Sequence, residues 1–137
     1  MYLLDTNVVS ELRRGNRIDP GVAAWARDID PADLFLSSIT ILEVETGILL
    51  MERRDSVQGA VLRAWMDNRV LPVFGARILP VDTAVAQRCA GLHVPDPRAE
   101  RDALIAATAL VHRLKVATRN IADFRPMGVD LVDPWAC

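Results

Sequence analysis

The sequence predicts an α/β fold in which a mostly parallel sheet is covered by helices on both faces. Short apolar runs of strand length alternate along the chain with longer segments of helical periodicity. The first of these runs is apolar at consecutive positions, which is typical of a strand buried on both faces. The length of 137 residues, with 51% apolar and 25% charged, fits one domain with its own core. We therefore expect residues 1–137 to form a single domain.

The first half of the chain changes several times between strand and helix patterns. Gly15 ends the first helical pattern, and Trp25 lies at the centre of the second. The expected elements, in order, are a strand at 2–4, helices at 6–13 and 20–28, a strand at 34–37, and helices at 41–54 and 56–71.

The second half repeats this alternation around one clear loop. The loop is the segment HVPDPRA at 93–99, which contains two prolines and mixed charge. Asp82 is a plausible N-cap for the helix that follows it. The expected elements are a strand at 77–81, helices at 83–92 and 100–114, and strands at 116–118 and 131–132.

Composition limits the classes of function. The net charge of −2 gives no overall attraction to nucleic acid, although all basic residues except Lys115 are arginines, whose planar fork suits phosphate. A compositional bias explains the arginines equally well. No apolar run is long enough to cross a membrane, and no secretory signal precedes the first strand. Cys89 and Cys137 fit no disulfide or metal spacing, so a reducing cytoplasm is the expected location.

Four carboxylates fall where an α/β sheet places its sites, beyond the carboxyl ends of strands. Asp5 ends the first strand, Glu43 lies early in the helix after the second, Asp102 opens an apolar helix, and Asp123 follows the strand at 116–118. Each has a simpler explanation: a helix cap for Asp5 and Asp102, a solvent-facing side chain for Glu43, and a turn for Asp123. Together they favour a shared site.

Clustered carboxylates repel one another, and a bound divalent cation removes that cost. Oxygen ligands select Mg²⁺, with Mn²⁺ as an alternative, over zinc. The histidines His93 and His112 have no partner at ligand spacing, and the chain contains no glycine-rich phosphate loop or nucleophile elbow. A carboxylate site with Mg²⁺ is suited to phosphodiester hydrolysis.

Other polar residues flank the four acids. Thr6, Thr118 and Asn120 are short side chains suited to hydrogen-bonding the proposed ligands, and Asn7 is as well explained as a turn residue. Five arginines near the proposed mouth are candidates for holding RNA phosphates, or else are simply exposed helix-end residues: Arg13, Arg14, Arg98, Arg101 and Arg119.

Four segments of the chain resemble the PIN-domain ribonucleases, specifically the VapC toxins of bacterial type II toxin–antitoxin systems. These are LLDTNVVSEL, LSSITILEVETG, RDALIAATA and VATRNIADF, and they occur in the family's order. The segments LPVFGARILPVD and VDPWAC resemble the FitB-type branch. The similarity runs from Met1 to about Trp135.

The resemblance implies a three-layer α/β/α domain with about five mostly parallel strands, acting as a Mg²⁺-dependent endoribonuclease on single-stranded RNA. It also implies a homodimer inhibited by a cognate antitoxin, with the pair bound to operator DNA through the antitoxin. By position, Asp5, Glu43 and Asp102 match the family's first three acids. The fourth acid lies at the position of Asn120 in some members and of Asp123 in others, so Asp123 is the candidate here.

Two other functions remain open from the sequence. The chain would act as an antitoxin-binding corepressor with little catalysis if its tryptophans line a docking groove. An aspartyl phosphatase also begins with a strand that ends in Asp, but that chemistry usually requires a second Asp two residues later, where this chain has Asn7.

Overall fold

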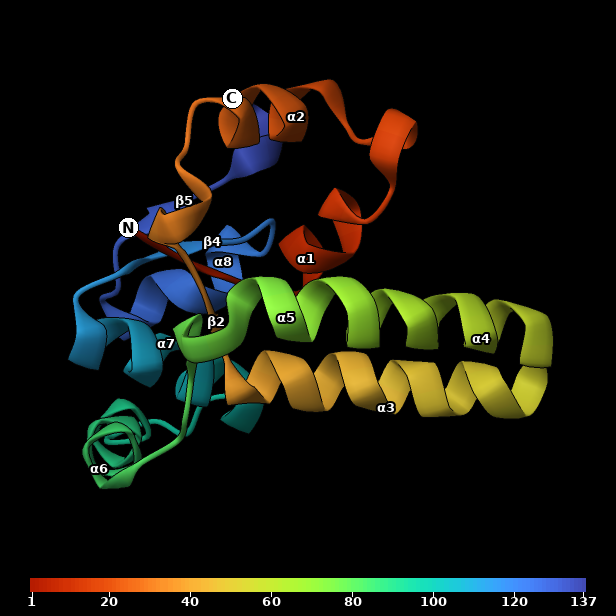
Figure 1. The fold of residues 1–137 in the computed structure, drawn as a ribbon. Helices are drawn as coiled ribbons and strands as arrows, with labels where there is room; N and C mark the ends of the chain where they lie inside the picture. The colour runs from red at the N-terminus through yellow and green to blue at the C-terminus, as the bar shows by residue number, and fades with distance from the viewer.

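The computed structural model describes all residues from Met1 to Cys137 and contains one five-stranded sheet in the order β3-β2-β1-β4-β5. Every neighbouring pair of strands is parallel, with β1 at the centre. The helices cover both faces of this sheet (Figure 1). The predicted fold class is therefore confirmed.

The strands are β1 (Tyr2–Leu4), β2 (Leu34–Ser37), β3 (Ile78–Leu79), β4 (Lys115–Ala117) and β5 (Leu131–Val132). The α-helices are α1 (Thr6–Leu12), α2 (Pro20–Arg27), α3 (Ser38–Arg54), α4 (Ser56–Trp65), α5 (Leu71–Phe74), α6 (Thr83–Leu92), α7 (Glu100–His112) and α8 (Ile121–Phe124). None of these helices is long and apolar enough to cross a membrane.

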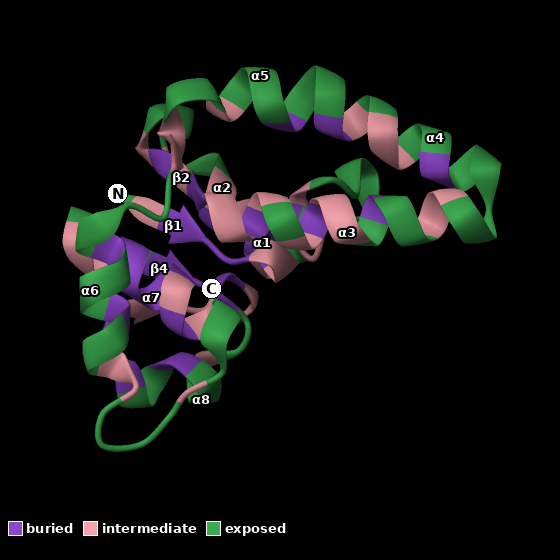
Figure 2. Cartoon of the chain, turned by 90° about the horizontal axis from the view of Figure 1, so that it is seen from below, coloured by how far each residue is buried: buried purple, intermediate pink, exposed green.

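The central strands separate two apolar cores. Leu3 packs with the helix α7 residue Ile105 on one face, whereas the next residue, Leu4, packs with Val8 and Met66 on the other. Because successive side chains of a strand point to opposite faces, a run of apolar residues is required wherever both faces are covered. Figure 2 shows the resulting buried centre beneath exposed outer helix faces.

The strand expected at 77–81 is shorter than predicted. Only Ile78 and Leu79 pair with β2, because the chain before them forms a 3-10 turn at Gly75–Arg77, and Pro80 has no N–H to continue the ladder. Arg77 closes the turn by donating from Nε to the Leu34 carbonyl at 2.9 Å. The prediction of five residues was wrong at both ends.

Helix α3 begins three residues earlier than expected, at Ser38 rather than at residue 41. The Ser37 side chain accepts a hydrogen bond from the Ile39 N–H at 3.0 Å and so caps the helix. Thr40 and Glu43 consequently lie on the first two turns, one turn apart on the same side of the helix.

The helix expected at 56–71 continues past Pro72 to Phe74. A π-helical turn at Met66–Val70 widens the backbone, and the Leu71 N–H donates to the Met66 carbonyl, five residues back. A proline in a regular helix clashes with the preceding turn, so the wider turn provides the space that Pro72 needs.

Helices α3 and α4 form a hairpin that extends away from the sheet (Figures 1 and 2). Arg63 on α4 donates to both carboxylate oxygens of Glu45 on α3, at 2.7 and 2.8 Å, and to Glu52 at 3.3 Å. Gly59 allows the helices to approach, because a Cβ built there lies 2.6 Å from the Cα of Glu52.

We predict that Gly59→Ala destabilises the protein by about 1–3 kcal/mol, the usual cost of overpacking, because the added methyl group meets backbone rather than a movable side chain. Urea unfolding followed by circular dichroism measures the change.

Gly91→Ala is the matched control, since Gly91 is also helical but a Cβ there meets nothing within 4 Å. It is expected to leave stability unchanged or raise it by up to about 1 kcal/mol. Equal stabilities of the two variants would contradict the close approach at Gly59.

Candidate functional site

Asp5 lies at the carboxyl end of β1, beside the end of β4. Its N–H donates to the Ala117 carbonyl at 2.9 Å, which continues the ladder between the two strands by one residue. Thr118, the residue directly after β4, donates from Oγ1 to Asp5 Oδ2 at 2.8 Å. The Thr6 N–H donates to Asp5 Oδ1, also at 2.8 Å. The chain adds β2 and β3 on one side of β1 and β4 and β5 on the other, so the strand order reverses between β1 and β4. Open α/β sheets form their sites at such a reversal.

Asp5 is therefore the N-cap of α1 and also a carboxylate directed by a neighbouring strand. It is 5% exposed. Burial raises its pKa above the ordinary value of 3.8, the hydrogen bonds from Thr118 and Thr6 oppose the rise, and the charges of Glu43 and Asp123 add to it. The cap and the site ligand were alternatives in the sequence, but the structure allows both roles in one residue.

Glu43 reaches the site from α3. The Thr6 hydroxyl donates to Glu43 Oε1 at 2.7 Å and also lies 3.5 Å from the Thr40 hydroxyl. Glu43 Oε2 lies 3.9 Å from Arg101 Nη1. The glutamate is thus turned inward, with 27% of its side chain exposed, rather than projecting into solvent.

Asp102 lies in the first turn of α7 and accepts no hydrogen bond from the protein. Burial raises its pKa, and the charges of Asp5, Asp123 and Glu43 raise it further, in that order. The four acids therefore share one electrostatic environment.

Asp123 is exposed on α8 and, like Asp102, accepts no hydrogen bond. Asn120, the N-cap of the same helix, makes no side-chain cap; its N–H instead donates to Thr118 Oγ1 at 2.9 Å. Asn120 thereby supports Thr118, which in turn holds Asp5. The carboxylate on this segment whose charge acts on Asp5 and Asp102 is that of Asp123.

In this structure no three acidic, histidine or cysteine side chains are arranged closely enough to enclose an ion. The donor set nevertheless fits a hard divalent cation, because it consists of carboxylates whose mutual repulsion such an ion would relieve. Asp102 and Asp123 line a cavity of about 300 Å³ together with the loop residues Pro97 and Arg98.

The five arginines predicted near the mouth differ in their partners. Arg101 faces Glu43, and Arg14 pairs with Glu11 at 3.2 Å. The guanidinium of Arg13 lies over the Trp65 ring at 5.8 Å, and that of Arg119 over the Trp135 ring at 5.1 Å. Arg98 lines the cavity beside Asp102.

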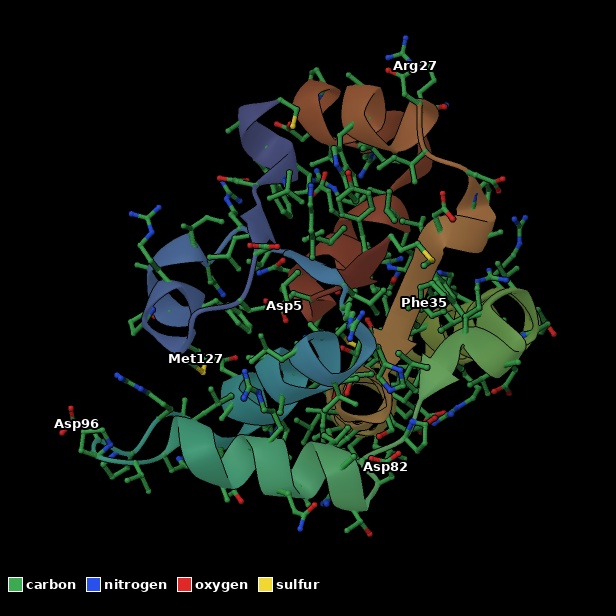
Figure 3. All side chains as sticks on the ribbon, turned by 90° about the vertical axis from the view of Figure 1, so that its left-hand side faces the viewer. Asp5, Arg27, Phe35, Asp82, Asp96 and Met127 are labelled. Atoms are coloured by element: carbon green, nitrogen blue, oxygen red, sulfur yellow. The ribbon has the colours of Figure 1, made fainter.

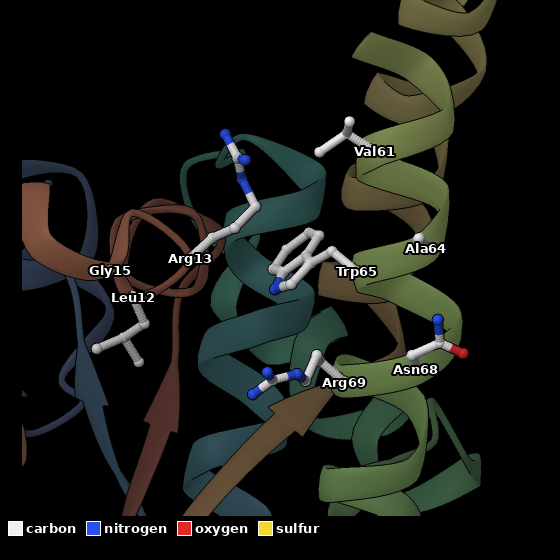
Figure 4. Close-up of a pocket in the computed structure, with 8 residues that line it drawn as sticks. All are labelled: Leu12, Arg13, Gly15, Val61, Ala64, Trp65, Asn68 and Arg69. Carbon is white, nitrogen blue, oxygen red and sulfur yellow. The ribbon is translucent and has the colours of Figure 1, made fainter. Parts of the chain in front are cut away.

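A groove begins beside Glu43 and runs between α1 and α4. It consists of three adjoining cavities of about 250, 600 and 170 Å³, all of them lined by Arg13 and Trp65. Figure 4 shows Trp65 extending from α4 toward α1, with Arg13 above it and Leu12 on the facing helix. Val61, which is 51% exposed, extends the apolar lining along α4.

Two features of the site were missed in the sequence. Thr40 is buried against Thr6, and its position three residues before Glu43 on a capped helix is a signal that could have found it. The groove joins helices from distant segments, so no local pattern identifies it. Trp65 packs partly against the core and also lines the groove.

The PIN domain family model matches residues 2–127 of the chain. Among curated proteins, toxin FitB of Neisseria gonorrhoeae is 37% identical over 141 residues, covering 98% of this chain and 99% of that protein. VapC ribonuclease Y4jK of Sinorhizobium fredii is 34% identical over 143 residues, covering 98% of both.

A solved structure gives the same result. The crystal structure of FitAcB from Neisseria gonorrhoeae superposes with a TM-score of 0.91 at 36% identity, covering all of both chains. Because the family model spans most of the sequence, and full-length relatives exceed 30% identity, the chain belongs to the PIN-domain family.

Proposed function

We propose that the protein is the toxin of a type II toxin–antitoxin system and acts as a metal-dependent endoribonuclease. The observation that carries this proposal is that four carboxylates from β1, α3, α7 and α8 lie near enough for their charges to act on one another: Asp5, Glu43, Asp102 and Asp123. Relatives similar over their full length are named VapC ribonuclease and toxin FitB.

In this proposal Asp5, Glu43 and Asp102 hold Mg²⁺, with Mn²⁺ as an alternative, and Asp123 completes the site. The chemistry that the bound cation supplies is orientation of the attacking water and neutralisation of charge developing on the phosphodiester. Thr6 orients Glu43 and Thr118 orients Asp5 through the hydrogen bonds described above. Burial of Asp5 excludes water that would compete for its oxygens.

The proposed substrate is single-stranded RNA or an RNA loop, which can be unstacked to reach the site. The proposed partner is a cognate antitoxin, which inhibits the toxin and connects a homodimer of it to operator DNA. We propose the cytoplasm as the location because both RNA and operator DNA are found there.

The groove between α1 and α4 is the surface that we propose for an apolar segment of the antitoxin. It is lined by Leu12, Val61 and Trp65, and its end reaches Glu43. A segment seated there would both cover apolar surface and obstruct the acidic site. The same groove would serve a corepressor without catalysis, which the activity assay below distinguishes.

Asp5→Asn is predicted to reduce Mg²⁺-dependent cleavage of single-stranded RNA by at least about 100-fold, because even side chains that only orient metal ligands contribute about 10–100-fold. Purified protein separated from its partner is assayed on total RNA. Asp28→Asn, which alters an exposed carboxylate at the end of α2, is expected to cleave normally.

Undiminished cleavage by the Asp5→Asn variant would contradict the proposed site. No cleavage by the unmodified protein in either metal would favour the corepressor. Asp123→Asn should cause a loss larger than that of Asn120→Ala if Asp123 is the fourth acid.

Asp102→Asn is predicted to raise the melting temperature of the metal-free protein at pH 7. Because the pKa of Asp102 is raised in the folded state, the folded protein favours the protonated carboxyl over the carboxylate. The stability that this protonated group provides is fully present below pH 3.8 and is lost as the pH rises through the folded-state pKa. The difference from the unmodified protein should therefore shrink toward acid pH. Thermal unfolding in EDTA at several pH values measures it.

Adding Mg²⁺ should stabilise the unmodified protein more than the Asp102→Asn variant, because the ion binds the folded state through this carboxylate. Asp130→Asn, an exposed acid on another loop, should respond to Mg²⁺ like the unmodified protein. Equal Mg²⁺ responses of all three proteins would remove Asp102 from the ligand set.

Val61→Glu is predicted to weaken antitoxin binding about 10-fold or more, because it places a charge in the apolar groove, while RNA cleavage is retained. Co-purification of the tagged toxin with its antitoxin measures binding. Val57→Glu is the matched control, since Val57 is 70% exposed on the same helix and lies outside the groove. Equal binding by both variants would place the antitoxin elsewhere.

A further inference from the structure

Arg98 differs from the other four arginines near the site in having no partner for its guanidinium. Arg14 and Arg101 face carboxylates, and Arg13 and Arg119 lie over indole rings. Arg98 makes no ion pair, although it lines the same cavity as Asp102 and Asp123. Its Nε is the one buried side-chain nitrogen or oxygen in the chain that lacks a hydrogen-bond partner.

The backbone of Arg98 is nevertheless fixed. Its N–H donates to His93 Nδ1 at 3.1 Å, which closes the loop 93–99 onto the end of α6. The other ring nitrogen of His93 lies 3.7 Å from the Cys89 sulfur. The loop therefore holds the backbone of Arg98 in place, while its guanidinium makes no hydrogen bond or ion pair with the protein.

The buried Nε has lost water without gaining a partner, which costs folding free energy. The terminal nitrogens of the same guanidinium are not buried, so they can donate to an external acceptor. The cavity of about 300 Å³ opens beside two carboxylates, so the acceptor must be an anion that the guanidinium can hold next to these negative charges. A phosphodiester of RNA meets this requirement, and a guanidinium binds its non-bridging oxygens in a fork.

We propose that Arg98 binds a phosphate of the RNA substrate in the cavity that it shares with Asp102 and Asp123, and so positions the strand at the acidic site. This inference rests on the proposed function. In Figure 3, Asp96 marks the tip of the loop, and Met127, another residue of the cavity lining, lies between that tip and Asp5 in this view.

The first test measures binding of a short fluorescein-labelled single-stranded RNA in EDTA, so that the RNA remains intact. Each phosphate contact to a single strand contributes about 0.7 to the slope of log affinity against log salt concentration. Arg98→Gln should lower that slope by about 0.7, and Arg98→Lys should retain it. Arg27→Gln, at the far edge of the molecule in Figure 3, is the matched control and should match the unmodified protein.

The second test measures cleavage kinetics in Mg²⁺. Arg98→Gln should lower kcat/KM by about tenfold or more, chiefly through KM, as expected for the loss of a charged hydrogen bond. Arg98→Lys should recover part of the loss. Arg98→Met should keep or raise the melting temperature, because it removes the unsatisfied Nε and retains the apolar stem.

An unchanged salt slope in Arg98→Gln, or no RNA binding by the unmodified protein, overturns the inference. A fall in melting temperature shared by the Gln and Met variants also overturns it, because Arg98 would then be structural. If the Arg98 variants bind and cleave RNA as well as the unmodified protein, the inference fails but the proposed function stands. A changed salt slope without cleavage by any variant rejects the nuclease and retains the phosphate contact.

Discussion

The site depends on a short chain of hydrogen bonds that joins the ends of two central strands. The Asn120 N–H donates to Thr118 Oγ1, and Thr118 donates to Asp5 Oδ2. Because the threonine accepts and donates at once, each bond polarises the other. Thr118 and Asp5 are both buried, so neither exchanges its partner readily for water. The direction of the Asp5 carboxylate is thus set by a residue 113 positions away.

Four carboxylates in one environment oppose folding, and the rest of the structure supplies the compensation. The two cores on either side of β1 and the backbone ladder between β1 and β4 hold the strand ends together regardless of charge. Burial near Asp5 therefore comes from the fold itself. The same burial raises the pKa of Asp5 and Asp102, so the positions suited to bind a cation are also the positions that cost stability without one.

The local parts of this arrangement could be predicted from sequence. The apolar residues before Asp5 indicate a buried strand, and the helix after Asp102 is apolar along most of its length. The convergence of the acids could not be derived from periodicity, because it depends on β4 lying beside β1 rather than β3. The positions of the acids beyond strand ends favoured a shared site, and the resemblance to a known family added a role for each of them.

Other features escaped prediction for similar reasons. The Ser37 cap moved the start of α3, and the π-helical turn before Pro72 extended a helix that proline was expected to end. The groove between α1 and α4 and the unpaired state of Arg98 exist only after distant segments pack. Whether a side chain is left unpaired, or a surface left uncovered, depends on which distant residues pack beside it. A local sequence pattern does not contain that information.

Position 120 is Asn in this chain, so the fourth acid of the proposed site is Asp123. Asp123 lies three residues later, in the first turn of α8. The charge of Asp123 acts on both Asp5 and Asp102, which agrees with this geometry. Its side chain is exposed and accepts no hydrogen bond, whereas Asp5 is held by Thr6 and Thr118. Under the proposed function, Asp5, Glu43 and Asp102 would therefore supply the ligands of a cation, and the exposed Asp123 would contribute mainly charge.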